Sequence, residues 1–289
     1  MLTQVFIAGG IMLGLGVGLS LVLALANKRL YVFEDPRIDE VEEMLPAANC
    51  GACGTAGCRA FAEVLVNGGA VPSQCTVNTP EMTAKIAELL GVDAGFGVKK
   101  VARLACAGGS NVARTHALYQ GVESCRAAAL ISGGGKGCAW GCLGFGDCEA
   151  ACPFDAIEMN EHNLPVVLED RCTACGNCVE ACPKDLFSIH PVTHRLWVAC
   201  KNELAGDAAE SECQVACIGC GRCAMDAAPG LITIENNLAV VDYDRNDRAD
   251  ISAIQRCPTG AIIWIEKDGE RVKGYAARKI VRKSPLPVG

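Results

Sequence analysis

The sequence predicts an α+β protein with one N-terminal transmembrane helix, a small helical domain, and then tandem units built on short β-hairpins. Three observations predict this fold class. Residues 5–26 contain neither charge nor proline, 20 of the 289 residues are cysteine, and a pattern of strand, polar turn and strand recurs after Cys152. The recurrence has a period of roughly thirty residues. The net charge of −7 and the lack of a basic stripe do not favour nucleic acid as a partner.

The stretch from Val5 to Ala26 is long enough to cross a membrane, because a helix of this length covers about 33 Å. Lys28 and Arg29 follow it directly, so the positive-inside rule predicts a single-pass protein of the inner (cytoplasmic) membrane whose remaining domains are cytoplasmic. Glycines recur every four residues along one helix face, at Gly10, Gly14 and Gly18. This pattern favours close packing on a partner helix.

A compact four-cysteine domain follows. Asp35 and Pro36 predict the start of a short helix that ends near Leu45. The segment NCGACGTAGC then supplies three cysteines, and a fourth comes sixteen residues later, which gives the set Cys50, Cys53, Cys58 and Cys75. A helix from Phe61 to Val66 is expected between the third and fourth ligand, and Thr79 caps another helix that Gly91 ends.

The cysteine runs in the middle of the chain predict cubane iron–sulfur clusters. Cys172, Cys175, Cys178 and Cys182, followed by Pro183, have the C-x2-C-x2-C-x3-C-P spacing that holds [4Fe–4S] clusters. The run CAWGCLGFGDCEAACP, from residue 138 to 153, is a stretched version of it. In two-cluster ferredoxins the fourth cysteine of each run ligates the other cluster. The predicted quartets are therefore Cys138, Cys142, Cys148 and Cys182 for one cluster, and Cys152, Cys172, Cys175 and Cys178 for the other.

Zinc and disulfides are the alternatives for so many cysteines. Zinc explains isolated C-x2-C pairs but not triplets that end in C-P. Disulfides require an oxidising compartment, and the first positive residue, Lys28, follows the apolar stretch instead of preceding it as in a secretory signal.

Four hairpin units follow one another, beginning at Cys152, Cys182, Ala227 and Cys257. The third unit keeps three ligands but has Ala227 where a fourth cysteine is expected. The fourth unit keeps only Cys257, and Asp247, Asp250 and Ala253 stand at the other ligand positions. The missing ligands all belong to one vanished cluster, so the surviving cluster is assigned to Cys217, Cys220, Cys223 and Cys257.

Sixteen cysteines are thereby assigned to four clusters, and Cys106, Cys125, Cys200 and Cys213 remain as uncertain extras. We favour two local thiol pairs, one in each segment, that pack as small hydrophobic side chains. A fifth cluster on these four thiols is the alternative. The glycine run at 133–137 is interpreted as a flexible approach to the first motif, because it lacks the spacing of a phosphate loop.

Two further groups of residues are expected at the surface. The histidines His116, His162, His190 and His194 lie in polar segments without ligand spacing. The basic run at 271–289 is interpreted as a solvated tail, with a contact to anionic headgroups or an acidic partner as the alternative.

The chain resembles the B subunit of the Rnf electron-transport complex in its long form. The resemblance rests on the N-terminal membrane helix, on LPAANCGACGTAGCRAFAEVL with Cys75, and on CRAAALISGGGKGCAWGCLGFGDCEAACPFDAI. It implies a component of an ion-translocating ferredoxin:NAD oxidoreductase that passes electrons between reduced ferredoxin and membrane subunits, with no substrate active site of its own. This chain departs from complete members of the family in its third ferredoxin-like unit, where those members carry eight cysteines. The number of clusters in the family therefore does not carry over to this chain.

Two other functions stay open from the residues: a component of another membrane redox complex, such as a hydrogenase, and a metal-stabilised membrane adaptor without redox function. The expected domains are a transmembrane helix (1–27), a juxtamembrane helix with the 4Fe-4S domain (28–95), a two-cluster ferredoxin-like domain (96–199), a single-cluster ferredoxin-like domain (200–270) and the basic tail (271–289).

Overall fold

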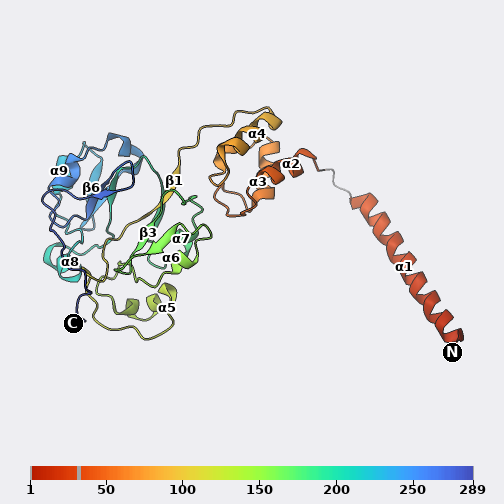
Figure 1. Cartoon of the computed structure of the whole chain (residues 1–289), viewed down its shortest axis with the longest axis horizontal. Coiled ribbons are helices and arrows are strands. Elements are labelled where there is room, and N and C mark those ends of the chain that lie inside the picture. The colour runs from red at the N-terminus through yellow and green to blue at the C-terminus, as the bar shows by residue number, and fades with distance from the viewer. Residues whose placement is uncertain (1, 31–33, 289) are drawn as a thin grey trace.

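The computed structural model describes residues 2–30 and 34–288, and Figure 1 shows helix α1 standing apart from the rest of the chain. Helix α1 spans Leu2–Leu30 and contains the predicted transmembrane stretch. Its apolar section, Gly9–Leu30, has a mean hydropathy of 2.1, and none of it is buried within the protein. Lys28 and Arg29 lie in the last turn. An apolar helix of this length that is exposed on all sides fits a membrane span.

The helical domain next to α1 contains α2 (Arg37–Met44), α3 (Cys58–Val66), the short 3-10 helix η1 (Pro72–Gln74) and α4 (Pro80–Leu90). Its core is small, and the fully buried side chains of Val41, Phe61 and Ile86 hold the three α-helices together. The predicted cap is confirmed, because Thr79 Oγ1 accepts a hydrogen bond from the Met82 backbone N–H at 3.3 Å. Gly91, at φ 66°, ends α4 as expected.

The rest of the chain forms two adjoining ferredoxin-like modules (Figure 1). The first contains β1 (Lys100–Leu104), α5 (Cys125–Leu130), η2 (Ser132–Gly135), α6 (Asp147–Ala150), β2 (Ile157–Met159), β3 (Pro165–Val167), α7 (Asn177–Ala181) and β4 (Phe187–Pro191). The second contains β5 (Leu196–Val198), α8 (Gly206–Glu212), α9 (Arg222–Asp226), β6 (Ile232–Glu235), β7 (Leu238–Val241), η3 (Tyr243–Arg248), α10 (Ser252–Gln255), β8 (Ile262–Ile265) and β9 (Arg271–Val272).

Three of the four predicted hairpins are confirmed, and the second is wrong. The pairs β2–β3, β6–β7 and β8–β9 are antiparallel hairpins, but β4 pairs with β1 and β5 pairs with β8. The segment before β1 takes part too, since the Val192 N–H donates to the Lys99 carbonyl at 2.9 Å. The sequence of β5, Leu-Trp-Val, is apolar throughout and buried, which suits a strand packed on both faces rather than the outer arm of a hairpin.

Apolar packing fills the region where the vanished cluster of the second module is expected. Ala253 and Ile254 of α10 are fully buried in the main core, against which Ala227 packs. Asp226 and Arg256 clamp α9 to α10 through two hydrogen bonds of 2.6 and 2.7 Å. Asp247 and Asp250 are exposed. Packed side chains therefore fill the region where the missing ligands would otherwise hold a cluster.

Two of the surface expectations need correction. The C-terminal segment is held against the protein, because the Arg278 N–H donates to the Pro258 carbonyl and the Leu286 N–H to the Ser110 carbonyl. His116 is exposed, but His190 is half-buried, and its ring lies 5.0 Å from that of Trp197 and 4.5 Å from that of Tyr243. Alternation along β4 turns His190 toward these rings, a contact that no local pattern indicates.

Candidate iron–sulfur sites

All twenty cysteines are free thiols, and they line five separate cavities in groups of four. We name the groups the N-terminal quartet (Cys50, Cys53, Cys58, Cys75), the first ferredoxin quartet (Cys125, Cys142, Cys148, Cys182), the second ferredoxin quartet (Cys152, Cys172, Cys175, Cys178), the C-terminal quartet (Cys217, Cys220, Cys223, Cys257) and the central quartet (Cys106, Cys138, Cys200, Cys213). The cavities are alike in size, with empty volumes between about 310 and 360 Å³. Each cysteine lines one cavity and no other among these five.

The N-terminal quartet is brought together as the sequence predicts. Asn49 accepts a hydrogen bond from the Cys58 N–H at 2.8 Å, which ties the start of the cysteine loop to the first turn of α3. Within the loop, the hydroxyl of Thr55 lies 3.1 Å from Cys53 Sγ. Gly51 takes a φ of 73°, which a residue with a side chain rarely adopts, so the chain can double back around the cavity.

The second ferredoxin quartet also matches its predicted set. Backbone N–H groups point at its sulfur atoms: Ala156 N–H donates to Cys152 Sγ and Ala102 N–H to Cys172 Sγ, both at 3.4 Å. The second of these comes from β1, seventy residues earlier in the chain. Hydrogen bonds of this kind stabilise thiolate ligands and set the reduction potential of a cluster.

The structure differs from the prediction in the first ferredoxin quartet, where Cys125 stands in the place expected for Cys138. Cys138 lines the cavity of the central quartet instead. The physical reason lies in the loop, because Cys138 and Cys142 are separated by three residues rather than two. The extra residue lets the chain turn at Gly141, whose N–H donates to the Cys138 carbonyl, so the two side chains line different cavities.

Asp147 fixes Cys125 in this quartet. Its carboxylate accepts hydrogen bonds from the Cys125 N–H at 2.8 Å, the Arg126 N–H at 3.0 Å and the Ser124 hydroxyl at 2.9 Å. Burial alone would raise the pKa of Asp147, but these hydrogen bonds outweigh burial and lower it. The signal available in the sequence was the stretched C-x3-C spacing between Cys138 and Cys142, which departs from the C-x2-C spacing of the second run.

The C-terminal quartet matches the set inferred from the complementary loss of ligands. Cys217, Cys220 and Cys223 come from the loop before α9 and its first turn, and Cys257 comes from the segment after α10. Asp247 and Asp250 are absent from its lining.

The expected local pairs among the four extra cysteines are only half correct. Cys200 and Cys213 line one cavity, but Cys106 and Cys125 line different ones. The predicted pair is separated because β1 carries Cys106 toward the second module while Asp147 holds Cys125 beside α6.

Burial makes these cysteines poor acids while no metal is bound. It raises the pKa of Cys142, Cys148, Cys178 and Cys223 to about 12, with neighbouring thiols adding to the effect. A cubane binds four thiolates, so its binding releases the thiol protons. The positive charge of its iron then compensates the buried negative charges of the thiolates. Among the residues that the structure describes, no three His, Cys, Asp or Glu side chains stand close enough to hold a single metal ion. Four thiols round one cavity have the ligand number and ligand type of a [4Fe–4S] cluster.

Contacts connect neighbouring quartets. Next to the N-terminal quartet, Thr76 donates a hydrogen bond to the carbonyl of Thr173 beside the second ferredoxin quartet. Burial is the main cause of the raised pKa of Cys175, and the thiols of Cys152 and Cys50 add to it. The two ferredoxin quartets are interleaved, because Cys148 and Cys152 lie on one segment and Cys178 and Cys182 on another.

Comparisons with known proteins agree with iron–sulfur sites. The family described as "Putative Fe-S cluster" matches residues 45–77, and the "4Fe-4S dicluster domain" matches residues 138–190. The chain is 43% identical to the B subunit of the Na(+)-translocating ferredoxin:NAD(+) oxidoreductase complex of Acetobacterium woodii, over 91% of this chain and 78% of that protein. It is 40% identical to the B subunit of the proton-translocating ferredoxin:NAD(+) oxidoreductase complex of Clostridium ljungdahlii, over 86% and 88%. It is 36% identical to the B subunit of the ion-translocating oxidoreductase complex of Methanosarcina acetivorans, over 87% and 95%.

Proposed function

Because this chain belongs to the B-subunit family of ion-translocating ferredoxin:NAD⁺ oxidoreductase (Rnf) complexes, we propose that its cysteine quartets carry electrons between a soluble ferredoxin and the membrane subunits. The chain is an iron–sulfur electron-transfer component of such a complex. Four [4Fe–4S] clusters are assigned to the N-terminal, first ferredoxin, second ferredoxin and C-terminal quartets. When bound, each supplies one-electron oxidation and reduction without any substrate chemistry.

The observation that carries this proposal is that the cysteine cavities adjoin one another through direct contacts instead of standing isolated. Thr76 bonds to Thr173 between the N-terminal and second ferredoxin quartets, and the two ferredoxin quartets share segments. A protein that used metal only for stability would need no such succession. Adjacent redox sites are what electron transfer through a protein requires.

Several residues of the chain tune and protect these sites. The N–H groups of Ala102 and Ala156 donate to sulfur. An N–H···S bond stabilises the reduced state of a cluster, because that state carries more negative charge. Apolar side chains such as Leu186 and Phe187 pack beside the first ferredoxin quartet and keep water away from it. Lower solvent exposure in turn affects the reduction potential.

The membrane helix supports an arrangement in which α1 crosses the membrane once and the quartets lie on the cytoplasmic side. Lys28 and Arg29 in its last turn favour this orientation. The N-terminal quartet follows α1 most closely in the chain, so we assign to it the exchange of electrons with the membrane subunits. We assign the exchange of electrons with ferredoxin to the ferredoxin-like modules. The relatives are named for sodium or proton translocation, and either coupling ion is compatible with a chain that carries only electrons.

The test is reduction of the full chain, purified in detergent without oxygen, by reduced ferredoxin. We expect cubane EPR signals to develop with ferredoxin as the only reductant, and the membrane subunits of an Rnf complex to co-purify from native membranes. An EPR-silent protein that contains zinc would support the adaptor function and contradict the proposal. Co-purification with hydrogenase subunits would support the other redox complex.

A further inference from the structure

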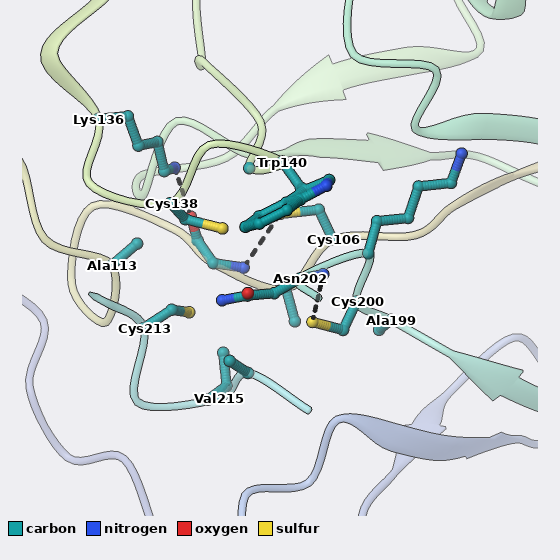
Figure 2. Close-up of a pocket in the computed structure, with 15 residues that line it drawn as sticks. Cys106, Ala113, Lys136, Cys138, Trp140, Ala199, Cys200, Asn202, Cys213 and Val215 are labelled. Carbon is teal, nitrogen blue, oxygen red and sulfur yellow. Dashed lines mark hydrogen bonds between the residues drawn. The ribbon is translucent and has the colours of Figure 1, made fainter. Parts of the chain in front are cut away.

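We propose that the central quartet, Cys106, Cys138, Cys200 and Cys213, holds a fifth [4Fe–4S] cluster that lies between the two ferredoxin-like modules. The four thiols come from four separate segments: the chain after β1, the loop after η2, the chain after β5 and the end of α8. Figure 2 shows their sulfur atoms turned toward one common space. This set differs from the four leftover cysteines of the sequence, because Cys138 replaces Cys125.

The cavity has the size and ligand number of the other four. Its empty volume is about 320 Å³, and four buried cysteines line it. Gly108 leaves part of this space open, because a Cβ atom there would lie 3.1 Å from Cys213 Sγ and 3.6 Å from Cys106 Sγ. A side chain at residue 108 would therefore crowd Cys213 Sγ and touch Cys106 Sγ.

Backbone N–H groups donate to two of the sulfur atoms, as they do at the second ferredoxin quartet. Cys106 Sγ accepts hydrogen bonds from Gly108 and Cys142, both at 3.4 Å. Cys200 Sγ accepts from Asn202 and Cys217, both at 3.3 Å. Two donors to one sulfur suit a thiolate, which is the form that binds iron.

An unpartnered polar group provides an independent indication of a ligand. Asn202 is 1% exposed, and its Oδ1 accepts a hydrogen bond from the Leu204 N–H at 2.8 Å, which fixes the orientation of the amide. Its Nδ2 has no partner in the protein and is buried. In Figure 2 this amide points into the space between the cysteines. A buried donor without an acceptor destabilises a protein, and a cluster sulfide would accept the hydrogen bond of this one.

A positive charge lies beside the cavity as well. Lys136 Nζ donates to the carbonyls of Gly108 at 2.7 Å and Cys142 at 2.6 Å, so the ammonium group is held next to the site. The glycine run before it, interpreted from sequence as flexible, forms a specific turn in which Gly133, Gly134 and Gly135 all have positive φ. That turn places Lys136 in the lining of the cavity. Its positive charge would offset part of the negative charge of four thiolates and their cluster.

The position of the central quartet links the two modules. Cys142, whose N–H donates to Cys106 Sγ, belongs to the first ferredoxin quartet. Cys217, whose N–H donates to Cys200 Sγ, belongs to the C-terminal quartet. A cluster here would take one electron from the reduced cluster of one of these two quartets and pass it to the cluster of the other quartet. This relay rests on the proposed function, whereas the binding of iron does not.

Iron and acid-labile sulfide per chain, measured on full-length protein prepared without oxygen, test the ligands directly. Five cubanes give about twenty irons and four give about sixteen, since each holds four. The double variant Cys200→Ala/Cys213→Ala should lose about four irons and an equal amount of sulfide. The matched control Val215→Ala, at a buried position in the same lining, should lose none. A parent protein with about sixteen irons, a variant that keeps the parent's iron, or one zinc at this site would overturn the proposal.

A second variant keeps the proposal testable if the double variant does not fold. Asn202→Asp retains the acceptor for Leu204 and replaces the unpartnered donor with an oxygen. We expect the iron content to stay at the parent value while the midpoint potential of one cluster becomes more negative. Unchanged potentials for all clusters would contradict a cluster beside Asn202. If the double variant loses iron but ferredoxin still reduces its C-terminal cluster normally, the relay alone is refuted. If ferredoxin does not reduce the parent protein, the proposed function alone is refuted.

Discussion

The carboxylate of Asp147 and the backbone N–H of Cys125 form a 2.8 Å hydrogen bond across twenty-two residues. Asp147 immediately precedes Cys148, so this bond brings two ligands of the first ferredoxin quartet to the same cavity. The same carboxylate also accepts from Arg126 and from the Ser124 side chain, which ties down the start of α5.

We expect the Asp147→Ala variant to lose the cluster of the first ferredoxin quartet. The first two N–H groups of α5 would lose their acceptor, and Cys125 would no longer be fixed beside Cys148. Iron analysis should show about four irons fewer than in the parent protein. Asp247→Asn, at an exposed aspartate outside every cysteine cavity, is the matched control and should keep all its iron. Full iron in both variants would show that Cys125 needs no such anchor.

Replacement of Cys53 by Ser should block transfer into the membrane subunits while the ferredoxin-like modules still oxidise ferredoxin in part. The reason is that Cys53 belongs to the quartet that follows the membrane helix, beyond the contact of Thr76 with Thr173. Stopped-flow absorbance of the variant with reduced ferredoxin measures the first step, and NAD⁺ reduction by the assembled complex measures the second. Thr83→Ala, on α4 outside the cavity, should behave as the parent does. A wild-type rate of NAD⁺ reduction in the Cys53 variant would refute this order.

Gly14→Leu in α1 should weaken association with the membrane subunits, because the glycine face lets another helix approach closely. A Cβ atom at Gly14 would meet nothing within 4 Å in the isolated chain, so the variant should fold normally. Gly16→Leu is the matched control, since residue 16 lies about 200° round the helix from residue 14. Co-purification yield from membranes distinguishes them, and equal yields would argue against a glycine interface.

His190 should make the part of the protein outside the membrane less stable in acid. Burial, with help from the charges of His194 and Arg103, lowers the pKa of His190 from 6.5 to about 4. The unfolded chain then binds the proton more readily, so this contribution to stability is complete above pH 6.5 and is lost as the pH falls toward 4. We expect the melting temperature of His190→Phe to fall less than that of the parent protein when the buffer is changed from neutral to mildly acidic. Parallel pH profiles would contradict this assignment.

The sequence by itself determined the chemistry and most of the ligands. Local spacing identified three ligands of each of the N-terminal, second ferredoxin and C-terminal quartets, since these three lie in a short loop whose geometry depends on neighbouring residues. The repeat of ferredoxin-like motifs, with its cross-paired ligands, supplied the distant fourth ligands Cys152 and Cys257. An uncharged stretch of sufficient length predicted α1. Capping residues such as Thr79 predicted the helix boundaries, because a cap acts within one turn.

Tertiary structure decided the contacts between segments that are distant in the chain. Strand β1 pairs with β4, and β5 with β8, so the second predicted hairpin does not form. These pairings carry Cys106 and Cys200 to one cavity, while Asp147 draws Cys125 to another. Strand partners and buried side-chain hydrogen bonds depend on which surfaces meet when the modules pack, and spacing along the chain contains no such information. The central quartet therefore becomes visible only in the folded protein.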